Sequence, residues 1–415
     1  MSINKEVDVL VIGAGPSGTI AASIIKQAGL SVQIVEKMQF PRFVIGESLL
    51  PRCMEALEEA KFLDAVKAKG FQQKDGAKFV MDDKICDFTF SEQHTKGWTW
   101  TWQVPRAEFD KTLADECEKM GIPVHYQTEV TDIKIADDHS VTTVKTIDGN
   151  TETISAKFII DGSGYGRVIP RMFGLEKDSQ QYPRKTLFCH MSDPKRHTVF
   201  EPNRITAIVY DATTWIWVIP FSNGNTSVGY VGNPEFFDRF PGNTPEEQFR
   251  ALLNAQPDLA YRFGESEMAW EPRTLQSWSA TTETFYGKGF VLTGNVTEFL
   301  DPIFSSGVTL ASVSAQTAAK LVIKHLNGEQ VDWEEGYMKP MQQGIDVFRT
   351  YVNRWYDGTL YKIFFSEGRQ QEIIGQICSV LAGYVWDQSN PFVANREKNL
   401  TTLARFLETK NKTTI

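Results

Sequence analysis

The residues best suited to chemistry form a glycine-rich segment, residues 13–18 (Gly-Ala-Gly-Pro-Ser-Gly), with the spacing of a dinucleotide-binding loop. Gly13 allows a tight turn, Gly15 lets the backbone approach a pyrophosphate, and Gly18 lets a helix pack close to a strand. A helix that starts here presents free N–H groups and its positive dipole end to phosphate. The segment therefore predicts dinucleotide binding, and the alternative is a tight turn that holds no ligand.

The segments around this loop are those that such a site requires. Residues 7–12 form a short apolar run, typical of a parallel strand that is covered on both faces. Residues 19–27 carry small and apolar side chains at helical spacing, and residues 32–35 predict a second strand. Glu36 follows that strand, where a carboxylate can accept hydrogen bonds from ribose hydroxyls.

Two later strands also end in glycine loops. Residues 157–160 predict a strand that runs into Asp161 and Gly162, and residues 290–293 predict another that runs into Gly294. The second of these leads to residues 301–307 and then to a helix. We expect both junctions to return the chain to the nucleotide-binding unit.

The loop of residues 40–51 contains two prolines and a glycine, which indicate a shaped connection. Arg42 lies just beyond the ribose-binding acid, where a cation can meet the adenine side of a dinucleotide. Ser48 is a candidate cap for a helix expected over residues 51–68. We expect Arg106 to flank the dinucleotide together with Arg42.

Composition limits the class of protein. The 415 residues are 41% hydrophobic and 23% charged, as in an ordinary soluble globular protein. The net charge of −9 argues against a nucleic-acid partner. The sequence has neither the long apolar run of a membrane span nor the layout of a signal peptide, so we expect a cytoplasmic protein. The five cysteines are scattered without the spacing of metal ligands, so no metal site is expected.

The order of the segments predicts an α/β fold, α+β overall, with a Rossmann-like nucleotide-binding domain into which a β-rich substrate domain is inserted. The nucleotide-binding domain spans residues 1–330, with main segments at about 1–75, 105–186 and 279–330. The β-rich substrate region occupies about 76–104 and 187–278. Residues 331–415 predict a C-terminal helical cap rich in aromatic side chains.

Some residues are ambiguous by themselves. Lys74, Lys78 and Lys84 lie close together, and their residue type alone predicts solvated surface lysines. In residues 98–102 tryptophan and threonine alternate, which predicts one face of a strand that belongs either to the core or to a pocket wall.

Four stretches together resemble the flavin-dependent halogenases, within the FAD monooxygenases of the p-hydroxybenzoate hydroxylase type. They are the glycine loop with Glu36, the Gly-Glu-Ser-Leu core of residues 40–51, the Trp-Ile-Trp-Val-Ile-Pro run of residues 215–220, and the Asp-Pro-Ile-Phe-Ser-Ser-Gly-Val run of residues 301–308. The resemblance covers roughly residues 5–365. It is strongest to the branch that acts on phenols and pyrroles, often tethered to a carrier protein.

The resemblance implies a role for a fifth position. The family's catalytic lysine lies in a Lys-x-Gly-Ala segment, which is matched here by Lys74 and the three residues after it. The resemblance therefore implies that Lys74 is not a surface lysine but the catalytic residue that directs the halogen to the substrate. One departure is plain, because the family has Gly-Asp where this chain has Gly294-Asn295. Asparagine keeps a hydrogen-bonding carbonyl group but loses the charge.

The expected site residues fall into three groups. The catalytic residues are Lys74 and Ser306. The residues expected to bind the cofactor are Gly13, Gly15, Pro16, Ser17, Gly18, Glu36, Lys37, Arg42, Ser48, Arg106, Asp161, Gly162, Gly294, Asn295, Pro302, Ser305, Ser306, Gly307 and Val308. The walls of the substrate side and of a tunnel are expected at Glu47, Trp215, Trp217, Ile219 and Pro220. The alternative for Trp215 and Trp217 is that they are core residues of one strand face, and both readings can hold.

The resemblance implies an enzyme whose cofactor is FAD, reduced by a separate flavin reductase. With O2 it would oxidise chloride or bromide to a hypohalous acid, which reaches the lysine through a tunnel and halogenates a small aromatic substrate. As an ammonium the lysine would hydrogen-bond this oxidant, and as an amine it would form a haloamine. The alternatives are a flavin-dependent hydroxylase, a reductase of the geranylgeranyl reductase type, and an FAD-binding protein that does not halogenate.

Overall fold

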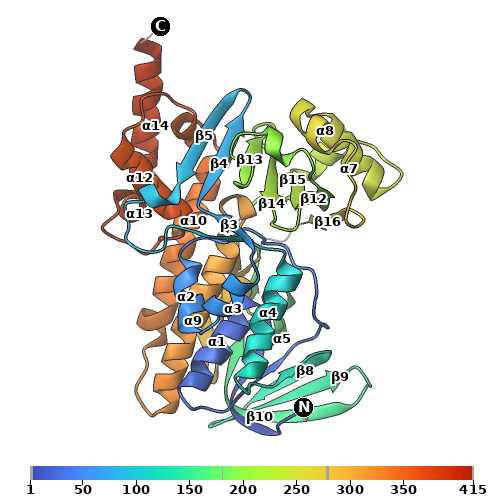
Figure 1. Cartoon of the computed structure of the whole chain (residues 1–415). Coiled ribbons are helices and arrows are strands. Elements are labelled where there is room, and N and C mark those ends of the chain that lie inside the picture. The colour runs from blue at the N-terminus through green and yellow to red at the C-terminus, as the bar shows by residue number, and fades with distance from the viewer. Residues whose placement is uncertain (1–2, 180, 277–279, 414–415) are drawn as a thin grey trace.

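Two sheets organise the computed structural model, which describes residues 3–179, 181–276 and 280–413 (Figure 1). The parallel strands of the first sheet are β1 (Glu6–Ile12), β2 (Val32–Val35), β7 (Val124–His125), β10 (Thr151–Asp161) and β19 (Phe290–Leu292). They lie in the order β19-β10-β1-β2-β7. The antiparallel strands of this sheet are β8 (Thr128–Ile135), β9 (Ser140–Thr146) and β18 (Tyr286–Gly287). The carboxyl ends of β1, β10 and β19 therefore meet at one edge, and each runs into a glycine junction.

Helices cover one face of this sheet (Figure 1). They are α1 (Pro16–Gln27), α2 (Cys53–Glu59), α3 (Leu63–Ala68), α4 (Arg106–Lys119) and α9 (Ser306–Leu326). Small buried residues, such as Ala21 and Ala22 of α1 and Ala315 and Ala318 of α9, belong to the same core and allow close helix packing. A separate apolar cluster on the other face joins β1 and β10 to β8 and α5 (Val168–Phe173).

The second sheet lies above the first in Figure 1. Its strands are β4 (Gly76–Met81), β5 (Lys84–Thr89), β12 (Lys185–Ser192), β13 (Thr206–Val209), β14 (Trp215–Pro220), β15 (Asn225–Gly232) and β16 (Arg273–Gln276), in the order β16-β12-β15-β14-β13-β4-β5. Phe249 and Leu252 are buried against one face of it, and three helices surround that cluster. These helices are α6 (Pro234–Phe237), α7 (Pro245–Asn254) and α8 (Pro257–Phe263).

Short strands connect these parts. The pair β3 (Gln72–Lys74) and β6 (Thr101–Gln103) brings Lys74 opposite Thr101. A three-stranded sheet contains β11 (Glu176–Lys177), β17 (Ala280–Thr282) and β20 (Glu298–Phe299). These connections place the start of the β-rich region beside the loop of residues 40–51.

The C-terminal region is helical and lies on the opposite side of β4 and β5 from α7 and α8 (Figure 1). Its helices are α10 (Lys339–Tyr356), α11 (Thr359–Phe364), α12 (Gln371–Leu381), α13 (Pro391–Ala394) and α14 (Arg396–Thr413). An aromatic layer joins it to the second sheet, since the Phe364 ring lies 4.9 Å from that of Phe79 and 5.0 Å from that of Phe88, centroid to centroid. This packing buries part of the C-terminal helical region, including Phe364 of α11, against β4 and β5.

The α/β fold class predicted from the sequence is confirmed, and several details differ. The single helix expected over residues 51–68 is two helices, because the chain turns at Lys61, whose φ is +62°. Ser48 does not cap a helix. Of residues 98–102 only the last two lie in a strand, so Trp98 and Trp100 belong to a loop. The domain boundary expected near residue 278 lies outside the described residues, and the domain limits remain a prediction.

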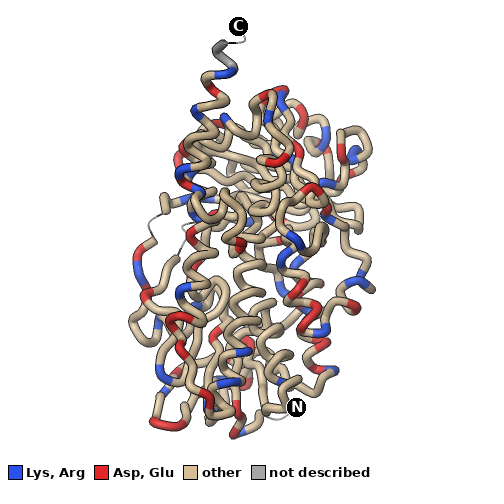
Figure 2. The backbone as a smooth tube through the Cα atoms, turned by 90° about the vertical axis from the view of Figure 1, so that its left-hand side faces the viewer, with Lys and Arg blue, Asp and Glu red and all other residues tan. Residues whose placement is uncertain are grey.

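Along the backbone, Lys and Arg positions are interspersed with Asp and Glu positions over the length of the molecule (Figure 2). In the described part of the chain no helix is both long enough and apolar enough to cross a membrane. Within the same residues no group of three His, Cys, Asp or Glu side chains is placed to hold a metal ion.

Candidate active site

The glycine loop has the backbone that its sequence predicts. Gly13 has a φ of +94°, a left-handed conformation that favours glycine. A Cβ atom on Gly18 would lie only 1.9 Å from the carbonyl oxygen of Gly13, so Gly18 serves the packing of α1 on β1 rather than lining the cleft. Gly15 lines the cleft, and its Cβ would meet only a guanidinium nitrogen of Arg42, at 3.5 Å.

The N-terminus of α1 opens into the same cleft. Gly15 precedes the helix without a side-chain cap, so the first N–H groups of the helix remain available to an anion. Pro16 and Ser17 line the cleft here, and the Ser17 hydroxyl donates to Thr293 Oγ1 at 2.7 Å. This hydrogen bond ties the glycine loop to the strand that leads to Gly294.

Glu36 is buried at the end of β2, and its carboxylate accepts a backbone hydrogen bond on each oxygen. The N–H group of Ala14 donates to Oε2 and that of Met38 donates to Oε1, both at 2.9 Å. The carboxylate lines the cleft and keeps lone pairs for ribose hydroxyls. Lys37 borders the cleft as well, but its ammonium group pairs with Glu129 at 2.7 Å on the surface.

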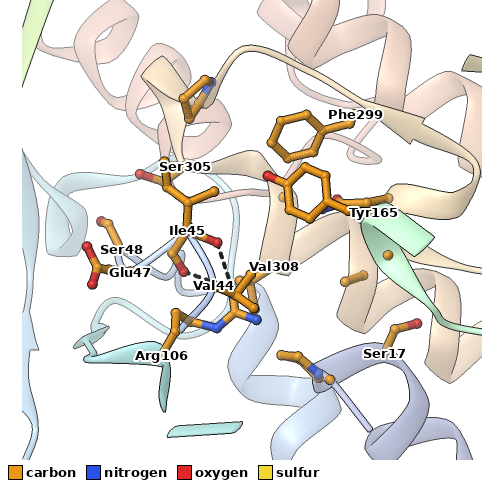
Figure 3. Close-up of a pocket in the computed structure, with 18 of the residues that line it drawn as sticks. Ser17, Val44, Ile45, Glu47, Ser48, Arg106, Tyr165, Phe299, Ser305 and Val308 are labelled. Atoms are coloured by element: carbon orange, nitrogen blue, oxygen red, sulfur yellow. Dashed lines mark hydrogen bonds between the residues drawn. The ribbon is translucent and has the colours of Figure 1, made fainter. Parts of the chain in front are cut away.

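Two arginines share one buried carboxylate beside the cleft. Arg42 Nη1 lies 2.8 Å from Asp110 Oδ2, and Arg106 Nε lies 2.8 Å from Asp110 Oδ1. Arg106 also donates to the carbonyl oxygens of Ile45 and Gly46, at 3.0 and 3.2 Å (Figure 3). Asp110 thus holds both predicted arginines against the loop of residues 40–51, and both line the cleft.

The opposite end of the cleft lies between this loop and the start of α9 (Figure 3). Ser305 has a φ of +56° and a ψ of +28°, which is uncommon for a residue other than glycine and marks a constrained turn. The residues of this turn that line the cleft are Pro302, Ile303, Ser305, Gly307 and Val308. Ser306, the first residue of α9, is buried and does not line it.

Two glycine junctions complete the floor of the cleft. Gly162 lines it, whereas the Asp161 carboxylate accepts the N–H groups of Ser163 and Ile169, at 3.0 and 2.8 Å, and so shapes the loop from behind. Burial raises the pKa of this carboxyl group. Asn295 lines the cleft and its side-chain oxygen faces Gly307, while Gly294 is covered by Ala311 of α9.

Lys74 is buried, with 2% of its surface exposed. Its ammonium nitrogen donates to the Ser48 hydroxyl and to the carbonyl oxygen of Leu49, both at 2.8 Å. Burial lowers the pKa of Lys74 to about 7. The surface position that residue type alone predicts is therefore wrong for Lys74 and also for buried Lys78, while Lys84 is exposed.

A small cavity connects Lys74 with the turn before α9. Lys74, Lys78, Phe79 and Phe304 line it. Four residues belong both to its walls and to those of the large cleft: Ile205, Ala207, Ile303 and Ser305. Lys74 thus lies behind the cleft, with one layer of side chains between the two spaces.

The residues predicted as walls of the substrate side are all buried, and most of them line the cleft. Trp215, Trp217, Ile219 and Glu47 border it, and Pro220 does not. The Trp217 Nε1–H group donates to the Ser227 hydroxyl at 3.0 Å. Both tryptophans also belong to the apolar core, so they contribute to core packing and to the wall of the cleft at the same time.

Sequence reasoning missed two aromatic rings of the cleft and the histidine that pairs with the cleft residue Glu47. Tyr165 and Phe299 face the cleft as a ring pair with centroids 5.1 Å apart (Figure 3). His190 Nε2 lies 2.5 Å from Glu47 Oε1 although the two residues are 143 positions apart. No sequence motif identifies these residues, because from sequence alone an isolated histidine or aromatic residue is assigned to the hydrophobic core.

The cleft runs from Glu36 through the uncapped N-terminus of α1 to the N-terminus of α9, an arrangement that fits an extended FAD molecule. The chain matches the family described as FAD binding domain over residues 6–333. The chain belongs to this family, and FAD is its cofactor.

Curated relatives of this family member are flavin-dependent halogenases. A 1H-pyrrole-2-carbonyl-[peptidyl-carrier protein] brominase of Pseudoalteromonas luteoviolacea is 26% identical over 398 residues, which are 93% of this chain and 94% of the relative. A tryptophan 2-halogenase of Chondromyces crocatus is 30% identical over 347 residues, 79% of this chain and 63% of the relative. The predicted resemblance to the flavin-dependent halogenases is confirmed.

Solved structures share the fold. A flavoprotein/dehydrogenase from Cytophaga hutchinsonii is 57% identical, with a TM-score of 0.96 and coverage of 98% of this chain and 100% of that one. The flavin-dependent halogenase CmlS is 26% identical, with a TM-score of 0.72 and coverage of 95% and 73%. The flavin-dependent brominase Bmp2 has a TM-score of 0.82 at 23% identity, covering 98% and 100%, and supports the fold alone.

Proposed function

We propose that this flavoenzyme halogenates a small aromatic substrate, using reduced FAD, O2 and chloride or bromide. The observation that carries the proposal is the buried position of Lys74 behind the turn of residues 302–305. Because a solvated lysine would release an oxidant to water, a lysine that directs a halogen has to be shielded. The relatives named above support the same chemistry.

When bound in its reduced form, FAD would supply two electrons to O2, and the halide would supply two more as it is oxidised to hypohalous acid, with water as the other product. Residues of this chain would bind and orient it: Glu36 would hold the adenosine ribose, the N-terminus of α1 would hold the pyrophosphate, and Arg42 and Arg106 would flank them. The free N–H groups at the start of α9 favour an anion near the flavin, which suits a halide. Lys74 then orients the oxidised halogen toward the substrate.

The wall residues support a division of the site into two spaces. Trp215 and Trp217 keep the substrate away from the flavin, which suppresses direct monooxygenation. The C-terminal helical region closes the substrate side, since Leu381 of α12 lines the same cavity as Lys74. The aromatic side chains around that cavity suit a phenol-like or pyrrole-like ring, which one of the relatives takes on a carrier protein.

The decisive experiment is product analysis. The protein is supplied with FAD, a flavin reductase, NADH, O2 and a simple phenol or pyrrole-2-carboxamide, with chloride, with bromide or with neither. We expect a product with the isotope pattern of the added halogen. A hydroxylated product that forms without halide would instead assign the chain to the hydroxylases, and no product in any arm would contradict the proposal.

A second candidate is an FAD-dependent dehydrogenase, because the 57% identical relative is described as a flavoprotein/dehydrogenase and because Asn295 stands where the halogenases have aspartate. A dehydrogenase would transfer electrons from an organic donor to the flavin without O2. Bleaching of the flavin by such a donor under anaerobic conditions, together with no halide-dependent product, would favour this candidate.

We propose further that the enzyme works in the cytoplasm with a separate flavin reductase. All five cysteines are free and buried, which suits a reducing compartment. The glycine loop at residues 13–18 is the one complete dinucleotide fingerprint in the sequence, and FAD would occupy it. Rapid, stoichiometric reduction of the flavin by NADH without a partner protein would contradict the need for a reductase.

A further inference from the structure

One hydroxyl group joins three separate parts of the chain. Tyr356 is the last residue of α10, and its hydroxyl donates to Asp301 Oδ2 at 2.9 Å. The same oxygen accepts a hydrogen bond from Trp215 Nε1 at 3.0 Å. The C-terminal helical region is therefore bonded both to the turn before α9 and to strand β14 of the second sheet.

On one side, the Tyr356 hydroxyl is bonded to Asp301, which fixes the turn of residues 302–305. Asp301 is fully enclosed, and its Oδ1 atom accepts the N–H group of Ile303 at 3.1 Å, which caps the short helical turn of residues 302–304. The left-handed Ser305 follows immediately, and α9 then begins. The position of the cleft-lining turn thus depends on the orientation of the Asp301 carboxylate.

Trp215 provides the contact on the other side. Its ring is buried and lines the cleft, 6.0 Å from that of Trp217. The indole N–H group has the Tyr356 hydroxyl as its hydrogen-bond partner. Tyr356 and Asp301 do not line the cleft themselves, but Tyr356 bonds Trp215 in one wall of the cleft and, through Asp301, is linked to the turn of residues 302–305 in another.

The surroundings keep this hydroxyl in place. The guanidinium carbon of Arg184 lies 3.9 Å above the centre of the Tyr356 ring, and Arg184 is fixed in turn by the carbonyl oxygen of Thr213. Burial, together with the Asp301 charge, raises the pKa of the Tyr356 hydroxyl, so it stays protonated and remains a donor. Burial also raises the pKa of Asp301, to about 6, so the carboxylate is available as an acceptor at neutral pH.

We propose that Tyr356 is a positioning residue. Through it, the C-terminal helical region sets the geometry of the turn of residues 302–305 and of the part of the cleft wall that Trp215 forms. Removing the hydroxyl would leave a buried indole N–H group and one carboxylate oxygen without their partner, and the two walls would no longer be tied together. The effect requires FAD binding and does not require halogenation, so it goes beyond the proposed function.

The same helix offers a matched control. Tyr351 is buried one and a half turns earlier in α10, and its hydroxyl donates to the carbonyl oxygen of Phe392 at 3.3 Å, within the C-terminal region. Tyr351→Phe and Tyr356→Phe each remove one hydroxyl group and keep the ring. Only the second removes a hydrogen bond to residues around the cleft.

The test measures the FAD dissociation constant, the visible absorption spectrum and the reduction midpoint potential of both variants without halide or substrate. Tyr356→Phe is expected to raise the dissociation constant about fivefold, the order of one hydrogen bond, and to shift the spectrum and the potential. Tyr351→Phe is expected to leave all three unchanged. Equal shifts in both variants, or none in Tyr356→Phe, would overturn the inference.

A double-mutant cycle makes the test independent of folding defects. Trp215→Phe removes the same hydrogen bond from the other side, so its effect on FAD binding should be smaller in the Tyr356→Phe background than in the natural chain. If Tyr356→Phe does not fold, Trp215→Phe is compared with Trp217→Phe, which also removes a cleft-lining indole but one that bonds Ser227 and not Tyr356. A spectral shift in Trp215→Phe that is no larger than that in Trp217→Phe would overturn the inference. Since none of these readouts uses a halide, failure of halogenation leaves them intact.

Discussion

The ammonium nitrogen of Lys74 lies 2.8 Å from the hydroxyl oxygen of Ser48. This contact joins the end of β3 to the loop of residues 40–51, and it places Lys74 behind a residue that lines the cleft. Both hydrogen-bond acceptors of the ammonium group, the Ser48 hydroxyl and the Leu49 carbonyl oxygen, are neutral. Burial without an adjacent carboxylate explains why the pKa of Lys74 falls to about 7.

This lowered pKa has a consequence for stability. Between pH 7 and 10.5 the unfolded chain carries a proton on Lys74 that the folded chain has lost, so the folded state gains relative stability as the pH rises. The contribution is lost as the pH falls toward 7, with a slope of at most about 1.4 kcal/mol per pH unit. Lys74→Met lacks this contribution.

We therefore expect the free energy of unfolding of the natural chain, minus that of Lys74→Met, to increase with pH in this window. Urea unfolding of the FAD-free proteins at about pH 7.5 and about pH 9.5 measures it. Lys84→Met serves as the control, because Lys84, the first residue of β5, is exposed. A difference for Lys74→Met that stays constant with pH would mean that Lys74 keeps an ordinary pKa.

The role of Lys74 in the reaction is tested by product formation. Lys74→Ala should abolish halogenation and leave FAD binding intact, because FAD is held by the glycine loops and by the start of α9. Added scavenger should then trap hypohalous acid that is no longer directed to the substrate. Lys84→Ala is expected to halogenate like the natural chain, and a Lys74→Ala variant that still does so would remove Lys74 from the mechanism.

Alanine substitutions at two glycines of the same loop should have different effects, one on stability and the other on FAD binding. A side chain at Gly18 would clash with the Gly13 carbonyl oxygen, so Gly18→Ala should destabilise the protein by about 1–3 kcal/mol or more. A side chain at Gly15 meets only a nitrogen of Arg42 at 3.5 Å, an ordinary contact. Gly15→Ala should therefore fold normally and weaken FAD binding more than about tenfold, because its methyl group occupies the approach to the pyrophosphate.

Thermal unfolding of the FAD-free proteins and titration with FAD separate the two effects. Gly336→Ala provides a control for glycine replacement away from the cleft, since Gly336 does not have a left-handed φ and its Cβ would meet only the Leu321 side chain, at 3.5 Å. Normal FAD affinity in Gly15→Ala would show that the pyrophosphate does not pass over this residue.

The glycine loop, its strands and the acid after β2 were predictable because they are contiguous in sequence and each has a local physical cause. The position of Lys74 was predictable only through the family resemblance. Residue type alone assigned it to the surface, since burial is decided by the pairing of β3 with β6 and by the loop of residues 40–51. The same limit explains why the burial of Lys78 was missed.

Contacts between distant segments could not be read from the sequence. The shared carboxylate of Asp110, the pair of Glu47 with His190 and the hydroxyl of Tyr356 depend on how the two sheets and the C-terminal helices meet. Ser306 and Asp161 were expected to bind the cofactor, but in the structure they lie beside the cleft and do not line it. The direction of a side chain at such a junction is set by local dihedral angles that spacing does not encode.

The carboxylate of Glu36 gives the last prediction. Its oxygens already accept the N–H groups of Ala14 and Met38, and this fixes their direction toward the cleft. Glu36→Ala removes an acceptor that carries a charge, so it should weaken FAD binding by about 1.5–3 kcal/mol, which is roughly tenfold or more in the dissociation constant. Glu36→Gln keeps the shape and should lie between the two.

Titration of the FAD-free protein with FAD, followed by flavin fluorescence, measures this effect. Glu129→Ala is the matched control, because it removes a carboxylate that pairs with Lys37 near the same end of the cleft but outside it. We expect Glu129→Ala to bind FAD like the natural chain. If Glu36→Ala also retains normal affinity, the ribose is held elsewhere and the extended orientation of FAD along the cleft is wrong.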